Sequence, residues 1–380
     1  MRILFDVTKA REQAHQSGLR RVSMRLGGAL GCQADVEKLD VTWRPRAGGF
    51  VEAGTRRSIR FGDDDVYLQP EICAEMDRPG FGDWLRATAG RRVAVYHDAI
   101  PLKHPEQTWP KSVARHPYYM RMLAQFDLVL AVSRASRDEL GAYWHWLDVA
   151  QRPPVDAIKL GADFAPGGRP VRPPERDPRS GGQSGGSSAP RLLMIGILEP
   201  RKGHGLLLDA CEKLWDEGQR FRLDIVGRVN PHFGKPIRAR IRSLSKAGHA
   251  VAHHETCPDN ELLQLYEQAA FTVFPSLAEG LGLPVLESLW LGVPVLASNI
   301  APVRECAESG GCRLFEAGDV QSLLGGLREL LNPQAPQLAE LRAQACTREL
   351  PTWDACARDV VVLIERNAQR RDNERDKEDE

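Results

Sequence analysis

The sequence predicts an α/β protein built from two Rossmann-like, doubly wound domains that face each other across a cleft. Three observations lead to this prediction. The chain has 380 residues, which is more than one ordinary core accommodates. Short apolar runs alternate with amphipathic segments in both halves, as expected of βαβ units with a mainly parallel sheet. Residues 165–190 are rich in Pro, Gly and Ser, so they are expected to link the two halves rather than to bury a core.

The first domain is expected to span residues 1–164. Its compact apolar runs end in polar or turn residues, which is typical of buried strands. Ser133 is expected to cap a helix, because its hydroxyl can accept a hydrogen bond from a backbone N–H of the first turn. The predicted elements are strands at Arg2–Val7, Val66–Leu68, Val93–Tyr96 and Leu128–Val132, and helices at Leu19–Leu30 and Ser133–Tyr143.

The second domain is expected over residues 191–350. A helix over 351–367 should then return to the first domain, and a charged, flexible tail should cover 368–380. The segment Gly280–Val303 is strongly apolar, but its three prolines and Glu287 argue against a membrane span, so it is interpreted as a buried helix followed by a buried strand. The predicted strands are Leu192–Ile197, Phe221–Val226, Phe271–Phe274 and Val293–Ala297; the predicted helices are Gly203–Glu217, Glu261–Ala269 with Asp259 as N-cap, Pro284–Leu291, Val320–Leu331, Pro336–Thr347 and Trp353–Arg366.

The composition argues against several classes of protein. The chain has 51 basic and 51 acidic residues, and this neutral balance argues against a nucleic-acid partner. Eight cysteines without a C-x-x-C pair are more typical of reduced thiols than of a disulfide framework or a zinc site. The N-terminus runs directly into a strand-like segment, so no secretory signal is expected, and the predicted location is cytoplasmic.

One candidate for chemistry is the turn Glu199-Pro200-Arg201-Lys202-Gly203, which follows the first strand of the second domain and precedes a helix. Ligands of doubly wound sheets bind at the carboxyl ends of the strands. Arg201 and Lys202 would stand there beside a helix N-terminus, and this combination of cations and backbone N–H groups suits a phosphate. The alternative is a solvated turn without a ligand.

A second candidate is the segment Glu279–Glu287, which follows the strand Phe271–Phe274. Its glycines permit tight turns, and its proline suits the first position of a helix. Glu279 is therefore expected in a loop above the strand ends, and Glu287 about one turn into the helix. A ribose diol and a sugar ring would fit two carboxylates at that separation. The alternative is two surface acids around a glycine-rich turn, although the apolar neighbours of Glu287 disfavour it.

These motifs carry a resemblance to a known family. The segment E-G-L-G-L-P-V-L-E at Glu279–Glu287 is similar to the E-x7-E signature of retaining glycosyltransferases of family 4, the glycosyl transferases group 1, which have the GT-B fold. Phe274–Ser276, Gly292–Val295 and the E-P-R-K-G-H motif at Glu199–His204 also resemble that family. The resemblance is close over Leu192–Phe315 and looser in the first half.

The resemblance implies a role for each matching position. Arg201 and Lys202 would hold the donor diphosphate in place of a metal ion, Glu279 would contact the donor sugar, and Glu287 would bind the ribose. Neither a metal nor another cofactor is expected. The residues implied in catalysis are His97, Arg201, Lys202 and Glu279, and those implied in donor binding are Gly18, Gly196, Glu199, Gly282, Leu283 and Glu287.

Two of these positions lie in the first half of the chain. Ser17–Arg21 resembles the family's glycine-containing loop near the acceptor and the diphosphate, although the usual pair of glycines is reduced to Gly18. His97 lies in a His-Asp pair at the end of a predicted strand, which places it beside the reacting anomeric carbon in the resembling family. The alternative is a structural histidine at a strand end.

A metal-dependent alternative starts from a different motif. Asp63–Asp65 contains a D-x-D sequence, which binds a metal–diphosphate in the other glycosyltransferase fold. The motif here precedes a short strand rather than following a nucleotide-binding strand, so it is interpreted as an acidic loop.

The resemblance implies a metal-independent, retaining glycosyltransferase that moves a sugar from a nucleotide diphosphate sugar to a hydroxyl of a glycan or a lipid-linked acceptor. The form of the Glu199–His204 motif favours a mannosyl- or rhamnosyl-type enzyme of bacterial surface polysaccharide synthesis, such as that of lipopolysaccharide. A lipid-linked acceptor would bring the protein to the inner face of the membrane. The alternatives are a nucleotide-sugar epimerase on the same architecture and a non-enzymatic nucleotide-sugar-binding module.

Overall fold

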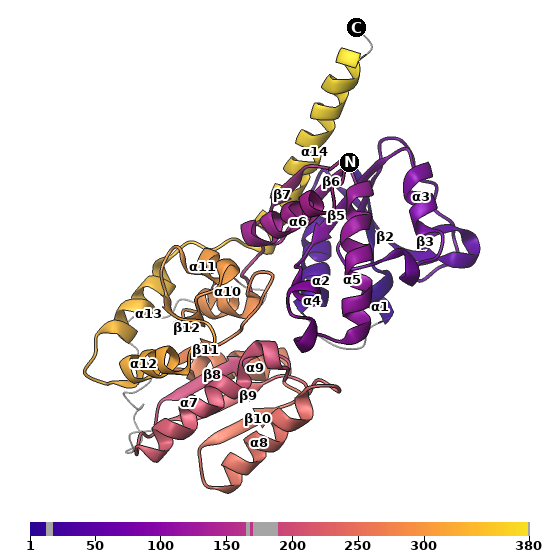
Figure 1. Cartoon of the computed structure of the whole chain (residues 1–380). Coiled ribbons are helices and arrows are strands. Elements are labelled where there is room, and N and C mark those ends of the chain that lie inside the picture. The colour runs from indigo at the N-terminus through magenta and orange to yellow at the C-terminus, as the bar shows by residue number, and fades with distance from the viewer. Residues whose placement is uncertain (13–17, 165–167, 170–188, 379–380) are drawn as a thin grey trace. The chain divides into compact units, whose positions relative to one another are not determined.

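The computed structural model of the chain describes residues 1–12, 18–164, 168–169 and 189–378 (Figure 1). The chain divides into two compact units. Unit 1 comprises Met1–Gly161 and Pro351–Glu380, and unit 2 comprises Ala162–Leu350. Most of the segment predicted as a linker, 165–190, lies outside the described residues.

Unit 1 is built on a sheet of seven strands within the described residues, in the order β3-β2-β1-β4-β5-β6-β7. All neighbouring strands are parallel except β3, which runs antiparallel to β2 at the edge. The strands are β1 (Arg2–Asp6), β2 (Glu37–Arg44), β3 (Gly49–Glu52), β4 (Val66–Gln69), β5 (Arg91–Tyr96), β6 (Leu128–Ala131) and β7 (Val155–Ala157).

The helices of unit 1 connect these strands and include the C-terminal helix of the chain. They are α1 (Thr8–Glu12), α2 (Gly18–Leu30), η1 (Pro45–Ala47), η2 (Glu75–Asp77), α3 (Phe81–Ala87), α4 (Ile100–Lys103), η3 (Pro105–Gln107), α5 (Pro110–Met122), η4 (Leu123–Gln125), α6 (Arg134–Trp146) and α14 (Trp353–Glu378). Helix α14 packs against α2 and touches β6. It continues to Glu378, past residue 367 where the sequence prediction ended it, because the charged stretch that follows contains neither Gly nor Pro and favours a helix.

Most predicted elements of unit 1 are confirmed, although β7, α3 and α5 were not predicted. Ser133 caps α6 as predicted, since its hydroxyl accepts the backbone N–H of Ser136 at 3.0 Å. The sequence prediction missed β2 and β3. Strand β2 is only partly buried and carries charged residues along its length, so it lacks the compact apolar run that marks the central strands.

Unit 2 contains a parallel sheet of six strands within the described residues, in the order β10-β9-β8-β11-β12-β13. The strands are β8 (Arg191–Ile195), β9 (Arg222–Val226), β10 (Val251–His254), β11 (Phe271–Phe274), β12 (Val295–Ser298) and β13 (Cys312–Phe315). The helices are η5 (Pro200–Lys202), α7 (His204–Asp216), α8 (Gly234–Lys246), α9 (Asp259–Gln268), α10 (Leu283–Trp290), α11 (Ala301–Ala307), α12 (Val320–Leu331) and α13 (Gln337–Thr347).

Three features of unit 2 test the sequence prediction. The apolar segment Gly280–Val303 forms the buried helix α10 and the buried strand β12, as predicted. Asp259 is not the N-cap of α9; Pro258 holds that position and Asp259 is the first helical residue. The pair α8–β10 was missed, because α8 is rich in basic residues and β10 is only partly buried.

Each unit has its own apolar core. In unit 1, aromatic rings from β2, β3, β4 and α3 pack together, with the centroid of the Trp84 ring 4.9 Å from that of Phe50 and 5.0 Å from that of Tyr67. In unit 2, apolar side chains cover both faces of the sheet. Within the residues that the structure describes, no helix combines the length and the apolar character that crossing a membrane requires.

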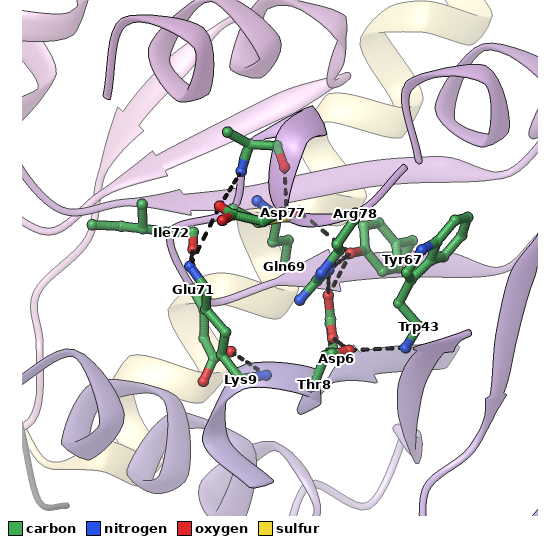
Figure 2. A network of polar contacts seen from close by, with 12 residues as sticks. Asp6, Thr8, Lys9, Trp43, Tyr67, Gln69, Glu71, Ile72, Asp77 and Arg78 are labelled. Atoms are coloured by element: carbon green, nitrogen blue, oxygen red, sulfur yellow. Dashed lines mark hydrogen bonds and ion pairs between the residues drawn. The ribbon is translucent and has the colours of Figure 1, made fainter. Parts of the chain in front are cut away.

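A buried polar network fixes the end of β1 in unit 1 (Figure 2). Asp6 ends the strand and is 1% exposed. Its Oδ2 accepts a hydrogen bond from the hydroxyl of Tyr67 at 2.7 Å and pairs with the guanidinium of Arg78. Its Oδ1 accepts from the backbone N–H and the hydroxyl of Thr8 at 3.0 and 2.6 Å. The buried carboxylate is thus fully engaged, as a charge away from water must be.

The network extends to the loop that follows β4. The carboxylate of Glu71 accepts the backbone N–H of Lys9 at 3.0 Å, and the Lys9 ammonium donates to the carbonyl of Ile72 and lies 3.8 Å from Asp77 (Figure 2). Burial, and next the negative charge of Asp6, raise the pKa of Glu71 to about 7. The folded chain therefore holds a proton on this carboxyl at a pH where an unfolded chain has released it.

We expect the stability of unit 1 to fall as the pH rises from about 4.5 to 7 through this one group, because the folded state binds more protons than the unfolded state across that window. Glu71→Gln removes this dependence. The variant should match the wild type near pH 4.5 and exceed it above pH 7, by on the order of 2 kcal/mol in the free energy of unfolding. Urea unfolding of both proteins at pH 5 and pH 8 measures the difference.

The exposed Glu365 on α14 provides the matched control, since Glu365→Gln makes the same chemical change in solvent. That variant should follow the wild type at both pH values. A Glu71→Gln effect of equal size at pH 5 and pH 8 would contradict the assignment of the proton to this carboxyl.

The start of α14 packs directly against Gly161, the last residue of the first segment of unit 1. A Cβ atom at Gly161 would lie 2.3 Å from the backbone nitrogen of Trp353 and 2.6 Å from its Cα. Backbone atoms cannot yield as a flexible side chain can, so only glycine fits.

We therefore expect Gly161→Ala to lower the free energy of unfolding by about 1–3 kcal/mol, because the added methyl group must displace the start of α14. Gly141→Ala is the control, because a Cβ there meets open space within the helix α6. That change should be neutral or stabilising by about 0.5–1 kcal/mol. Urea unfolding of the two variants measures the contrast, and equal stability would show that α14 does not rely on this contact.

Candidate active site

The candidate site of unit 2 lies where the strand order changes direction. Strands β8, β9 and β10 progress to one side of the sheet, and β11, β12 and β13 progress to the other. The loops that follow β8 and β11 therefore leave the same edge of the sheet next to each other, at the place where doubly wound sheets bind ligands. The first loop carries Arg201 and Lys202, and the second carries Glu279.

A glycine lets these two loops touch. Gly203 follows η5 with a φ of +73°, and a Cβ there would lie 2.0 Å from the carbonyl oxygen of Pro275. Next to this contact, the backbone N–H of Leu277 donates to the carbonyl of Arg201 at 2.7 Å. The left-handed conformation and the close backbone approach both require glycine at this position.

The contact brings two cations and a carboxylate together. The Nζ of Lys202 is 2.5 Å from Oε1 of Glu279, and one Nη of Arg201 is 3.4 Å from Oε2 of the same carboxylate. The same Arg201 nitrogen donates to the carbonyl of Ala278 at 3.1 Å, and its second Nη is 2.6 Å from Oε1 of Glu199. Three of the residues that the sequence predicted for catalysis thus meet in one cluster, together with Glu199 from the predicted donor-binding set.

The cluster is largely buried, so the electrostatic interactions between its charged side chains are strong. Lys202 is 9% exposed, and its ammonium also lies over the ring of Phe274 at 5.7 Å. Burial alone would raise the pKa of Glu279, but the positive charges of Lys202 and Arg201 outweigh it and lower that pKa. The Glu279 carboxylate is consequently ionised at neutral pH and balances the cations.

The second part of the Glu279–Glu287 motif forms the predicted turn into a helix. Gly282 is the N-cap of α10 with a φ of +116°, and Leu283 is the first helical residue. Glu287 lies in the second turn of α10 and is 4% exposed, among the apolar side chains that the sequence places around it. Glu279 and Glu287 are therefore on a loop and on a helix, respectively, as expected.

One residue near the cluster, Asn230, was missed from sequence, and another, His204, was named only as the last residue of the Glu199–His204 motif. Asn230 follows β9, and its Nδ2 donates to Oε2 of Glu199 at 3.1 Å. His204 begins α7 with no exposed surface, and burial lowers its pKa to about 3, so its ring is neutral. Only the position of Asn230 after a strand could have drawn attention to it; nothing in the sequence pairs it with a residue 31 positions earlier.

A cavity of about 540 Å³ adjoins the η5 loop in unit 2. Its walls come from the starts of α7 and α8 and from the loops after β11 and β13. The lining residues are Pro200, Gly203, Gly205, Leu206, His232, Phe233, Pro236, Ile237, Leu277 and Gly318. Gly196, another predicted donor-binding residue, lies between β8 and this loop. A Cβ atom at Gly227 would lie 2.0 Å from the carbonyl oxygen of Gly196, so the two backbone segments are in close contact.

The remaining predicted residues belong to unit 1. His97 follows β5, and its Nε2 lies 2.8 Å from the carbonyl oxygen of Pro70. Because a carbonyl only accepts, Nε2 carries the proton; burial lowers the pKa of His97 and favours this neutral ring. Gly18 begins α2 and is exposed, and a Cβ there would meet no atom within 4 Å. Its neighbour Ser17 lies outside the described residues.

Other sequence motifs have a structural place. The acidic loop Asp63–Asp65 precedes β4, and the carboxylate of Asp65 accepts the backbone N–H of Gly62 at 2.7 Å. In the described part of the chain, no three His, Cys, Asp or Glu side chains gather as ligands of a metal ion would.

A protein-family model matches a large part of the second half of the chain. Residues 184–347 match the family model described as "Glycosyl transferases group 1". This range contains all of the Arg201–Lys202–Glu279 cluster and α10.

Curated relatives with assigned activities are glycosyltransferases. The serotype-specific mannosyltransferase WbdA of Escherichia coli is 27% identical over 270 residues, which cover 68% of this chain and 32% of WbdA. The chain thus spans about a third of the length of that relative. The O-antigen chain mannosyltransferase B of Escherichia coli is 25% identical over 274 residues, covering 71% of this chain and 69% of that protein.

Solved structures share the fold over nearly the whole chain. Sucrose-phosphate synthase from Thermosynechococcus elongatus aligns with a TM-score of 0.68 at 17% identity, covering 96% of this chain and 98% of that one. Anabaena HepE, solved in complex with UDP and glucose, aligns with a TM-score of 0.66 at 14% identity, covering 96% and 99%. The likeness confirms the predicted fold class, two Rossmann-like domains of the GT-B type. Residues 184–347, a little over two fifths of the chain, are similar to the glycosyl transferases group 1 family.

Proposed function

We propose that this chain is a retaining glycosyltransferase that moves a sugar from a nucleotide diphosphate sugar to a hydroxyl group of a glycan or a lipid-linked acceptor. The observation that carries the proposal is the cluster of Arg201, Lys202 and Glu279 at the change of strand direction in unit 2. The family match over the same residues supports it.

In this proposal, the two cations bind the donor diphosphate. Arg201 presents a planar pair of donors and Lys202 a compact charge, a combination that suits phosphate oxygens. Both cations contact Glu279, so the diphosphate competes with this carboxylate for them. As the bond to the sugar breaks, negative charge grows on the leaving diphosphate, and the fixed cations stabilise it in the transition state. The transfer needs no metal ion under this proposal.

The acidic residues would bind the rest of the donor. Glu279, once displaced from the cations, can accept hydroxyl groups of the donor sugar, and Glu287 can accept both hydroxyls of the ribose. Between them, the start of α10 at Gly282 and Leu283 would face the diphosphate, because the helix dipole favours an anion there. Gly196 and Glu199 would complete the donor side from the β8 loop.

The acceptor side is proposed for unit 1. His97 would stand beside the anomeric carbon with its ring neutral, because Nε2 donates to Pro70 and Nδ1 then offers a lone pair. Gly18 would let the start of α2 approach the diphosphate.

The donor sugar is proposed to be mannosyl-type, with a rhamnosyl-type sugar next. The names of two relatives, WbdA and the O-antigen chain mannosyltransferase B, support mannose and a role in surface polysaccharide synthesis. A cytoplasmic enzyme that works at the inner face of the membrane would fit a lipid-linked acceptor.

The donor is the first quantity to measure. We expect one nucleotide diphosphate sugar from a panel of GDP-, UDP- and dTDP-sugars to raise the melting temperature selectively and to release its nucleoside diphosphate slowly by hydrolysis. Excess chelator should change neither result, because Arg201 and Lys202 take the place of a metal ion. Proton NMR of the sugar transferred to an acceptor should show the anomeric configuration of the donor.

Three results would speak against the proposal in different ways. No response to any donor would oppose nucleotide-sugar binding altogether. A new nucleotide sugar in place of a free nucleoside diphosphate would indicate an epimerase. Loss of turnover in chelator would show that the cations do not replace a metal.

The cations themselves are tested by substitution. We expect Lys202→Ala to lower kcat/KM at least about 100-fold, because the developing charge on the diphosphate loses its nearest cation. The same change leaves Glu279 buried beside one cation instead of two, so the melting temperature should fall as well. Glu279→Gln keeps the shape of the side chain but leaves Lys202 and Arg201 without their shared carboxylate, so it should lose activity to a similar extent and lower the melting temperature at least as much.

Lys213 on the exposed face of α7 is the control, because Lys213→Ala removes the same charge from the helix that follows η5, away from the cluster. It should retain wild-type kcat/KM. Activity close to that of the wild type in purified Lys202→Ala would rule out the proposed role of the cluster.

A further inference from the structure

Arg201 is held from two sides by acidic residues. One Nη lies 3.4 Å from Glu279, and the other lies 2.6 Å from Oε1 of Glu199. Glu279 belongs to the loop after β11, whereas Glu199 precedes Arg201 on the loop after β8. If the diphosphate displaces Glu279, Glu199 is the acidic contact that continues to fix the guanidinium.

Glu199 is itself anchored by Asn230. The Nδ2 of Asn230 donates to Oε2 of Glu199 at 3.1 Å. The Oδ1 of Asn230 accepts the backbone N–H groups of His232 and Phe233 at 2.9 and 3.2 Å, at the entry to α8. Because two N–H donors point at Oδ1, the orientation of the amide is determined, and its NH2 group must face Glu199.

The backbone around Asn230 is also tied to the β8 loop. The N–H of Asn230 donates to the carbonyl of Leu198 at 3.3 Å, and the N–H of Leu198 donates to the carbonyl of Arg228 at 2.9 Å. The N–H of Gly234 donates to the carbonyl of Asn230 at 2.8 Å. Asn230 is thus fixed both to the loop it supports and to the start of α8.

We propose that Asn230 and Glu199 form a relay that positions Arg201 for the donor diphosphate, with Asn230 as a positioning residue that never touches the donor. The inference rests on the proposed function, since it assigns Arg201 a diphosphate to bind. The side chain of Glu199 is 11% exposed and that of Arg201 is 20% exposed, so water competes little for either partner.

A purely electrostatic view and the relay predict opposite effects of removing Glu199 on diphosphate binding, so the direction of the change tests the relay. Glu199 is a negative charge next to a site for an anion, so its removal should strengthen diphosphate binding if charge were all that mattered. In the relay, Glu199 instead contributes orientation, and its removal should weaken binding because the guanidinium loses its fixed geometry.

Glu199→Gln is therefore the first variant, with binding of GDP, UDP and dTDP measured by calorimetry. For the nucleoside diphosphate that the wild type binds, we expect the Kd of the variant to rise roughly tenfold, because the guanidinium loses its close ion pair with Oε1 of Glu199. Asn230→Ala, which changes no charge, should raise Kd by a similar factor. Asn230→Asp keeps the acceptor for His232 and Phe233 but sets two carboxylates against each other, so it should raise Kd further.

The double variant Asn230→Asp with Glu199→Gln reverses the hydrogen bond. The amide introduced by Glu199→Gln would donate to the new carboxylate and still accept from Arg201, at the net charge of the wild type. We expect Kd to return to within about threefold of the wild type. Rescue of two weakened single variants by their combination is not expected of a merely structural role.

Two controls separate the relay from general damage. Asn260→Asp on the exposed start of α9 adds the same charge away from the loop and should leave Kd unchanged. The matching nucleoside without phosphates should bind all variants equally, because Arg201 has no diphosphate to hold. In turnover assays, Glu199→Gln, Asn230→Ala and Asn230→Asp should raise KM for the donor and lower kcat. They should leave KM for the acceptor unchanged.

The outcomes distinguish the two proposals. If the wild type binds none of the three nucleoside diphosphates, the proposed function fails and the relay fails with it. If the wild type binds one and Glu199→Gln binds it as tightly or more tightly, the relay alone is overturned. Failure of the double variant to recover, with its melting temperature intact, would also overturn the relay.

Discussion

The close contact of two loops at the change of strand direction in unit 2 is the constraint on which the site depends. Gly203 approaches the carbonyl of Pro275 so closely that no side chain fits, and this brings Lys202 within 2.5 Å of Glu279. The cations would otherwise repel each other across a short turn. Burial lowers the pKa of Lys202, and the shared carboxylate opposes this shift and fixes both cations in place, an arrangement that stabilises an anion with little reorganisation.

The strand order changes direction in both units, but different residues lie at that place in each. In unit 1, the strand order also changes direction between β1 and β4, and there the ends of the strands are joined by Asp6, Tyr67 and Arg78 in a buried network. In unit 2, the equivalent place holds a cluster of cations around Glu279. The first network is closed around its own carboxylate, whereas the second gathers cations that suit an outside anion. One fold thus holds a closed polar network and a cluster of cations at corresponding positions.

The sequence predicted the parts that are local. The Glu199–Gly203 turn and the Glu279–Glu287 segment are contiguous, and glycine and proline mark their geometry, so both were found. Central strands such as β6 were found because they are buried on both faces. Strand β2 was missed because it is half exposed, and the contacts Lys202–Glu279 and Asn230–Glu199 join residues 77 and 31 positions apart. Tertiary packing, not local pattern, selects such pairs.

The position of α14 has a consequence for how the chain is made. Because Pro351–Glu380 completes unit 1, whose first segment ends at Gly161, unit 2 is inserted within unit 1 in the sequence. On the ribosome, the first segment emerges early but waits for α14, which follows unit 2 in the sequence. Unit 2 has a continuous chain and can finish folding first. Nascent unit 1 therefore leaves α2 without its contact to α14 until unit 2 has been synthesised, which makes that interval the one in which a chaperone has most to protect.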